Sequence, residues 1–152
     1  MWQAGAVTGT ALYEVRRAKG RRELAAAMKL RHEVFCVEQG VPTHEESDGR
    51  DREGVHLVAV RGRQLLGTCR LLMVGPTAQL SRLAVSRSAR RTGIATALLE
   101  AAEVETRAVG GQRLVLHAQT YARELYDRTG YRARGRAFTE AGIEHIAMER
   151  EL

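Results

Sequence analysis

The sequence is poor in the residues that mark several protein classes. Only two of its 152 residues are cysteines, and both have apolar neighbours. This indicates small core residues in a reducing compartment, with a single disulfide between them as the alternative. No apolar run approaches the roughly 20 residues that a membrane-spanning helix needs. The amino terminus lacks the basic start and apolar stretch of a secretory leader. We therefore expect a cytoplasmic protein with no membrane partner.

Acidic residues are missing from a long internal stretch. None lies between Glu53 and Glu100, where seven arginines occur, whereas residues 45–53 carry five carboxylates. A basic segment next to an acidic one indicates either a site for a polyanionic ligand or a solvated, arginine-rich surface, and charge alone does not separate the two. A nucleic acid is the weaker candidate, because aromatic side chains that would stack on bases make up only 5% of the chain. We expect no nucleic-acid partner.

What is present suffices for a folded core. A length of 152 residues and a hydrophobic content of 44% place the chain among ordinary globular proteins. It contains no linker, repeat or low-complexity stretch, so we expect a single domain over residues 1–152.

Hydrophobic periodicity predicts alternating strands and helices, most of them ended by glycine or proline. The acidic segment, residues 43–53, has no hydrophobic period and is expected to be a loop that can include a helical turn. The order of elements favours one mixed α/β sheet covered by helices. Strands are expected at residues 11–18, 56–60, 64–74, 78–85, 113–118, 131–138 and 145–149, and helices at residues 21–39, 93–109 and 121–128.

The sharpest local pattern is a strand, a short arginine-rich loop and then a helix, over residues 78–109. The first backbone N–H groups of a helix have no intrahelical partner, and a loop that enters the helix can wrap them around a phosphate. Gly93 lets a ligand come close, Ala95 keeps the first turn small, and Arg90 and Arg91 add positive charge. The same pattern also fits an ordinary strand-to-helix turn.

This loop is similar to the acetyl-CoA signature of the GNAT family of N-acetyltransferases. That signature is (Gln or Arg)-x-x-Gly-x-(Gly or Ala), and Arg90, Gly93 and Ala95 meet it. A second block, residues 119–131 (QTYARELYDRTGY), resembles the family pattern Asn-x-x-Ala-x-x-(Leu or Phe)-Tyr-x-x-x-Gly-(Phe or Tyr). The two blocks follow each other on the expected elements, and the resemblance runs from about residue 11 to the end.

A narrower likeness connects the chain with the ElaA-like branch of the family. It rests on the stretch LRHEVFCVEQGVP, on the acidic loop with Asp48 and Asp51, and on the ending EAGIEHIAM. This branch indicates the fold and says little about the acceptor.

The family resemblance implies an α/β fold with a mixed, mostly antiparallel central sheet of about six or seven strands and helices on both faces. It implies acetyl-CoA as co-substrate, no metal, and an amine acceptor that is either a small molecule or a lysine side chain. Similar proteins often form homodimers, and no segment of this sequence marks an interface. The alternative from a different class is a non-catalytic module that binds CoA or an acyl-CoA.

The resemblance also implies which residues contact the co-substrate. The chain departs from the family pattern twice, because Arg91 stands where many members have glycine and Gln119 replaces an asparagine. Neither change removes the backbone amides of the loop. The contacts carried over are Leu83, Ala84, Val85, Arg90, Arg91, Thr92, Gly93, Ile94, Ala95, Thr96 and Gln119.

Tyr126 matches the family's catalytic tyrosine, which is placed to protonate the departing CoA thiolate. A phenol has an ordinary pKa of about 10, so it is protonated at neutral pH and can donate. The other interpretation is a core tyrosine whose hydroxyl bonds to the backbone.

The general base stays open at this point. The loop carboxylates are ordinarily solvated and the histidines ordinarily packed within strands, and a chain of waters could also serve. The acidic loop could instead recognise a cationic acceptor. The candidates for the base are Glu38, Glu46, Asp48, His117, His145 and water.

Overall fold

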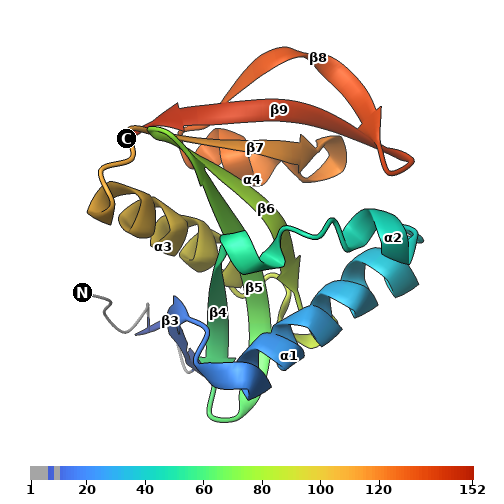
Figure 1. Cartoon of the computed structure of the whole chain (residues 1–152), viewed down its shortest axis with the longest axis vertical. Helices are drawn as coiled ribbons and strands as arrows, with labels where there is room; N and C mark the ends of the chain where they lie inside the picture. Colours follow the sequence, from blue (N-terminus) through green and yellow to red (C-terminus); the bar gives the residue numbers. More distant parts are fainter. Residues whose placement is uncertain (1–6, 9–10) are drawn as a thin grey trace.

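The computed structural model describes residues 7–8 and 11–152 (Figure 1). Residues 1–6 and 9–10 of the expected domain lie outside this described part. The strands are β1 (Val7–Thr8), β2 (Ala11–Leu12), β3 (Glu14–Arg17), β4 (Val55–Arg61), β5 (Gln64–Val74), β6 (Thr77–Val85), β7 (Arg113–Gln119), β8 (Arg132–Glu140) and β9 (Ile143–Glu151). The α-helices are α1 (Gly20–Arg31), α2 (Thr43–Glu46), α3 (Ile94–Ala108) and α4 (Arg123–Arg128). The π-helical segment is η1 (His32–Glu38), and the 3₁₀-helical turns are η2 (Asp51–Glu53), η3 (Arg87–Ala89) and η4 (Thr120–Ala122).

The main sheet has seven strands in the order β3-β4-β5-β6-β7-β9-β8, while β1 and β2 form a separate hairpin. Every neighbouring pair of the main sheet is antiparallel except β6 and β7, which run parallel. The crossover between these two strands contains α3, as a parallel connection requires. The expected α/β fold with a mixed, mostly antiparallel sheet is confirmed.

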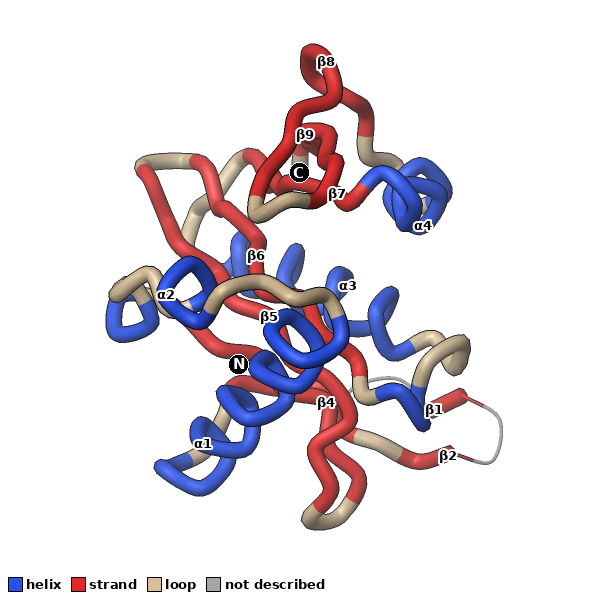
Figure 2. The backbone as a smooth tube through the Cα atoms, turned by 90° about the vertical axis from the view of Figure 1, so that its right-hand side faces the viewer, coloured by secondary structure: helices blue, strands red, loops and turns tan. Residues whose placement is uncertain are grey.

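Helices cover both faces of the sheet, as expected. Ala27 of α1 packs against Val58 and Val60 of β4. Leu98 of α3 belongs to the main core together with Leu57 and Ala59, which point to the opposite face of the same strand. This alternation explains why β4 is apolar at successive positions, since both of its faces are buried. Figure 2 shows β7, β8, β9 and α4 at one end of the molecule, with α1 and β4 toward the other.

Three predicted segments differ in detail from the structure. The strand expected at residues 11–18 is interrupted at the buried Tyr13, because the chain passes there from the small hairpin into the main sheet. The helix expected at residues 21–39 is α-helical only to Arg31 and continues as the wider π-helical segment η1. The acidic loop contains the short helical turns α2 and η2. Both cysteines are free, and Cys69 is buried in the core.

Candidate functional site

The parallel strands β6 and β7 separate partway along their length. They pair only where residues 77–80 lie opposite residues 113–116. Beyond that point, residues 81–85 and residues 117–119 continue as strands without pairing with each other. The main-chain groups of β6 that would have bonded to β7 are therefore left without a strand partner, and the sheet opens between the two strands.

A bulge in β6 accompanies this opening. Arg82 and Leu83 together stand opposite the single residue Cys69 of β5, because the register between the two strands shifts there. Arg82 has a positive φ of 58°, which is uncommon for a residue other than glycine. A bulge of this kind bends the strand that contains it, and here the bent part of β6 is the part that has left β7.

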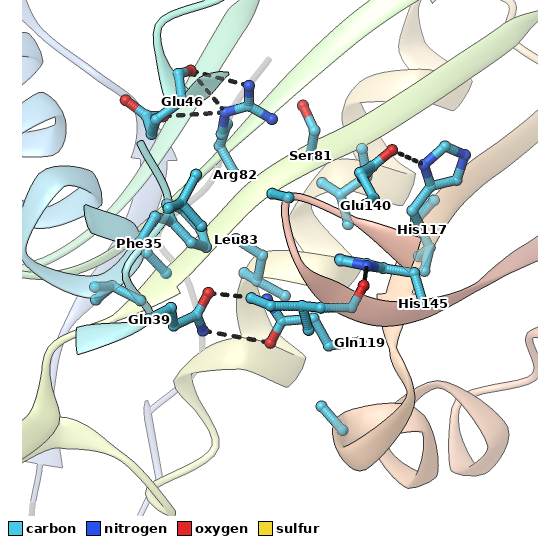
Figure 3. A pocket seen from close by; sticks show the side chains of 18 of the residues that line it. Phe35, Gln39, Glu46, Ser81, Arg82, Leu83, His117, Gln119, Glu140 and His145 are labelled. Atoms are coloured by element: carbon cyan, nitrogen blue, oxygen red, sulfur yellow. Dashed lines mark hydrogen bonds and ion pairs between the residues drawn. The ribbon is translucent and has the colours of Figure 1, made fainter. Parts of the chain in front are cut away.

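A pocket of about 950 Å³ occupies the opening (Figure 3). Its walls come from η1, from the acidic loop, from the separated parts of β6 and β7, and from α4 and the β8–β9 hairpin. The structure thereby brings together most of the expected site. The expected site residues that line the pocket are Leu83, Ala84, Val85, Arg90, Ala95, Gln119 and Tyr126.

The remaining expected residues form the loop and first turn of α3 beside the pocket. The backbone N–H groups of residues 91–96 donate to no acceptor among the described residues, since the first bond into the helix is from Ala97 N to Gly93 O, at 3.0 Å. Gly93 has a φ of 86°, so this position favours glycine for its left-handed backbone. Ile94 is buried in the core, which leaves only its main chain to meet a ligand. Six successive amides at a helix N-terminus form a site suited to a phosphate.

Arg91 departs from the glycine of the family pattern, and its backbone conformation is one that suits glycine. It has a left-handed φ of 64°, a conformation that costs an ordinary L-residue roughly 1–2 kcal/mol. Its side chain is exposed and forms no hydrogen bond or ion pair with the part of the chain that the structure describes. The guanidinium is thus available to a ligand on the amides.

The comparison with known families decides the assignment. Residues 21–152 match the model of the acetyltransferase (GNAT) domain family. The chain belongs to the GNAT family. Over 135 residues it is 34% identical to the Uncharacterized N-acetyltransferase YjcF of Bacillus subtilis, a match that covers 88% of this chain and 96% of that relative.

Two solved structures are similar in fold. An Acyl-CoA N-acyltransferase from Pseudomonas aeruginosa is 33% identical, with a TM-score of 0.79 over 91% of this chain and 98% of that one. Escherichia coli ElaA has a TM-score of 0.78 and 24% identity, over 91% of this chain and 98% of its own. The first agrees with this chain in sequence and fold, and the second shows the shared fold.

The guanidinium of Arg90, in the GNAT signature loop, turns back toward β6 and η1. Its Nη2 donates to Glu38 Oε1 at 2.9 Å, and its Nε donates to Val85 O at 3.1 Å. The hydrogen bond from Arg90 lowers the pKa of the Glu38 carboxyl, with a further contribution from Arg87. Arg90 therefore ties the loop to η1, and Arg91 is the arginine of the pair that remains unpaired in the described structure.

Gln119, which replaces the family asparagine, bonds across the pocket to Gln39, the residue that follows η1 (Figure 3). Its Nε2 donates to Gln39 Oε1 at 2.9 Å, and Gln39 Nε2 in turn lies 3.3 Å from Gln119 Oε1 and 3.3 Å from the Tyr121 hydroxyl. The pair links the end of β7 with the end of η1.

Tyr126 lies in α4 with 7% of its surface exposed and lines the pocket. Its ring packs edge-on against Tyr131, with 6.0 Å between the ring centroids. Its hydroxyl has no hydrogen-bond partner among the described residues, so the interpretation of a core tyrosine bonded to the backbone finds no support there. Burial raises the pKa of the phenol, and nearby Cys69 and Tyr121 raise it further, so the hydroxyl stays protonated at neutral pH.

Three carboxylates of the acidic loop, Glu46, Asp48 and Asp51, are paired with arginines, contrary to the expectation that they are simply solvated. Glu46 accepts hydrogen bonds from Arg31 at 2.6 and 2.9 Å and from Arg82 at 3.0 Å. Arg70 donates to Asp48 at 2.7 and 2.8 Å and to Asp51 at 2.9 Å. Arg31 and Arg70 are almost fully buried, with 1% and 2% of their surface exposed. Buried cations need paired anions, which is the role these carboxylates fill.

This network also corrects the interpretation of the charge pattern. Arg70 and Arg82 of the basic segment face the acidic loop, so these two are neither a polyanion site nor a free surface. The hydrogen bond from Arg70 lowers the pKa of Asp48 well below its ordinary range, against the opposing effect of burial. A cationic acceptor would have to displace arginines in order to reach Glu46 or Asp48. One signal was available in the sequence: Arg31 lies on the apolar face of its helix, where an arginine requires an acidic partner.

Two absences concern the described residues alone. Residues 7–8 and 11–152 contain no group of three or more histidine, cysteine or acidic side chains arranged to hold a metal ion. No helix in that part of the chain is long and apolar enough to cross a membrane.

Proposed function

We propose that the chain transfers an acetyl group from acetyl-CoA to a primary amine by direct attack, within one acetyltransferase domain formed by residues 1–152. One observation carries the proposal. The opening between β6 and β7 has unpaired helix N-terminal amides at one end, and the unpaired Tyr126 hydroxyl belongs to the same pocket. The Pseudomonas aeruginosa relative, an Acyl-CoA N-acyltransferase by name, supports an acyl-CoA as co-substrate.

The amides of residues 91–96 would bind the pyrophosphate, with Arg91 adding charge. The pantetheine arm would lie along residues 83–85 of β6, whose main-chain groups have no partner on β7 and, apart from the Val85 carbonyl that accepts from Arg90, can bond to it. Gln119 would contact the same arm from the β7 side, and its partner Gln39 would then follow it or be released.

A neutral amine would attack the thioester carbonyl, and a backbone amide of the bulged strand would stabilise the oxyanion. Collapse of the tetrahedral intermediate releases the CoA thiolate, which takes the proton of Tyr126. The raised pKa of the phenol keeps that proton in place until negative charge develops on sulfur. The acceptor would be a small-molecule amine or a lysine side chain.

The first test is a calorimetric titration of the chain with acetyl-CoA, with CoA and adenosine 3′,5′-bisphosphate as controls. We expect micromolar binding that requires the pantetheine arm. Release of the CoA thiol in the presence of primary amines then tests transfer. No binding would overturn the proposal, whereas binding without transfer to any amine would point to a non-catalytic CoA-binding module.

A further inference from the structure

His145 lies on β9 and points into the pocket (Figure 3). Its cross-strand neighbours are Gln119 on β7 and Phe138 on β8. Directly paired residues of an antiparallel sheet share a face, so the imidazole lies on the same face as Gln119, beside the opening. Phe138 stacks on the imidazole with 6.0 Å between the ring centroids and 22° between the planes, and this packing fixes the ring.

One hydrogen bond sets the tautomer of this imidazole. Nδ1 lies 2.7 Å from the carbonyl oxygen of Ile143. A carbonyl oxygen only accepts, so Nδ1 is the donor, and in the neutral imidazole Nε2 therefore carries the lone pair. Nε2 has no partner among the described residues. Among the described residues, the Tyr13 hydroxyl is the one side-chain polar atom that is both fully buried and unpaired. Nε2 is unpaired and is therefore not fully buried, and His145 lines the pocket.

The other candidate bases are engaged elsewhere. Glu46 and Asp48 are held by the buried arginines, and Glu38 is held by Arg90. His117 is bonded through Nδ1 to Glu140 at 3.1 Å, with side chains 40% and 50% exposed, so this pair is half in solvent. His145 alone among these side chains combines burial with an accepting atom that has no partner in the described structure.

We propose that His145 Nε2 is the general base of the acetyl transfer, an inference that rests on the proposed function. Tyr126 and His145 then act from opposite faces of the opened sheet. Tyr126 belongs to the core on the α3 face, and His145 shares its face with Gln119, away from the buried Leu116 and Ala118 of β7. A reacting thioester placed in the opening can be reached by the acid from one side and by the base from the other.

The transfer forms one carbon–nitrogen bond and breaks one carbon–sulfur bond. The amine nitrogen forms a bond to the thioester carbonyl carbon, and the carbonyl electron pair moves onto oxygen. Nε2 takes one proton from the attacking nitrogen, the oxygen pair returns, and the carbon–sulfur bond breaks. The thiolate takes the Tyr126 proton, and the proton held by His145 replaces it through solvent. An amide and the CoA thiol are the products, and both side chains return to their starting states.

The test compares His145→Asn with wild type and with His32→Asn, a matched control at an exposed histidine outside the pocket. Asparagine retains an N–H near the position of Nδ1 for the Ile143 carbonyl, and it has no basic nitrogen. Acetyl-CoA affinity is measured by calorimetry, and transfer by thiol release with propylamine, benzylamine, spermidine and an Nα-acetyl-lysine amide. Melting temperatures verify folding, and His145→Gln serves as a second variant if His145→Asn is unstable.

We expect His145→Asn to lower kcat/KM for the amine about 100-fold or more, with the dissociation constant of acetyl-CoA within twofold of wild type. The loss in kcat/KM should be smaller with 2,2,2-trifluoroethylamine, because this amine is largely neutral at pH 7 and depends less on proton removal by a general base. The second control is His117→Asn, since His117 on β7 is the other histidine among the described residues that line the pocket.

Two results would overturn the inference while leaving the proposed function standing. The first is that wild type transfers the acetyl group and His145→Asn keeps an activity within threefold of it. The same conclusion holds if His117→Asn loses the activity and His145→Asn does not. The other is a long-range ¹H–¹⁵N imidazole spectrum that shows the His145 proton on Nε2, a readout that needs no acceptor. If wild type binds acetyl-CoA and transfers to none of the amines, the proposed function fails and this inference fails with it.

Discussion

Neutralising Glu46 should destabilise the fold far more than the same change a few residues away. The Glu46 side chain is 10% exposed, and its Oε2 accepts three hydrogen bonds, two from Arg31 and one from Arg82. Glu46→Gln leaves the Arg31 charge buried, since that side chain is 1% exposed. Removing one partner of a buried pair costs about 3–5 kcal/mol, and the lower end applies here because Asp51 still pairs with Arg31 at 2.8 Å.

Glu53→Gln is the matched control in the same loop. Glu53 lies 3.4 Å from Arg50, and the two side chains are 58% and 43% exposed, so solvent screens this pair. An exposed pair of this kind is worth about 0–1 kcal/mol. We expect a loss of about 3 kcal/mol for Glu46→Gln and less than about 1 kcal/mol for Glu53→Gln.

The assay is urea unfolding at pH 7, supported by thermal melts. A loss of 3 kcal/mol corresponds to a fall in melting temperature of roughly 6–12 °C for a chain of this size. The double variant Arg31→Met, Glu46→Gln should lose less than the sum of the single losses, because it removes both charges of the pair. Equal stabilities of the Glu46 and Glu53 variants would refute the buried network as the support of this loop.

Three further outcomes follow from the site. Tyr126→Phe should lower kcat about 100-fold with unchanged acetyl-CoA affinity, and unchanged turnover would remove the phenol from the mechanism. Arg91→Ala should weaken acetyl-CoA binding in calorimetry several-fold and reduce its salt dependence, whereas equal affinity would assign the binding to the amides alone. The lowered pKa of Asp48 contributes stability that is complete above its unfolded pKa of about 3.9 and is lost as pH falls toward the folded pKa. Asp48→Asn should therefore be less stable at pH 7 and lose less stability between neutral pH and pH 2, and parallel acid-unfolding curves for the two proteins would contradict this.

The sequence predicted local features well, because local features depend on neighbouring residues. The helix expected at residues 93–109 is α3, within one residue at each end, since its apolar face recurs at helical spacing and a glycine stands at each end. The succession of strands and helices along the chain and the two GNAT motifs could also be recognised from the sequence. The π-helical continuation of α1 could not be predicted, because the spacing of apolar residues over seven positions does not distinguish a π-helix from an α-helix.

The candidate site divides in the same way. The amides of the loop after β6 could be anticipated, since a helix N-terminus leaves its first N–H groups unpaired whatever lies around it. The partners of the loop carboxylates could not, because Arg31, Arg70 and Arg82 reach them from three different elements. Periodicity says which side chains are buried and is silent on which distant side chain each one meets.

The sequence by itself determined that this protein has an α/β fold, and it predicted a phosphate-binding loop and a catalytic tyrosine in the family position, because each depends on residues that are close together in the chain. Only the tertiary structure decided that β6 leaves β7 at a bulge, and that the acidic loop neutralises buried arginines. It also decided that Tyr126 and His145 reach one pocket from opposite faces of the sheet. Those features depend on strand register and on contacts between segments far apart in sequence, which are fixed only when the whole sheet has formed.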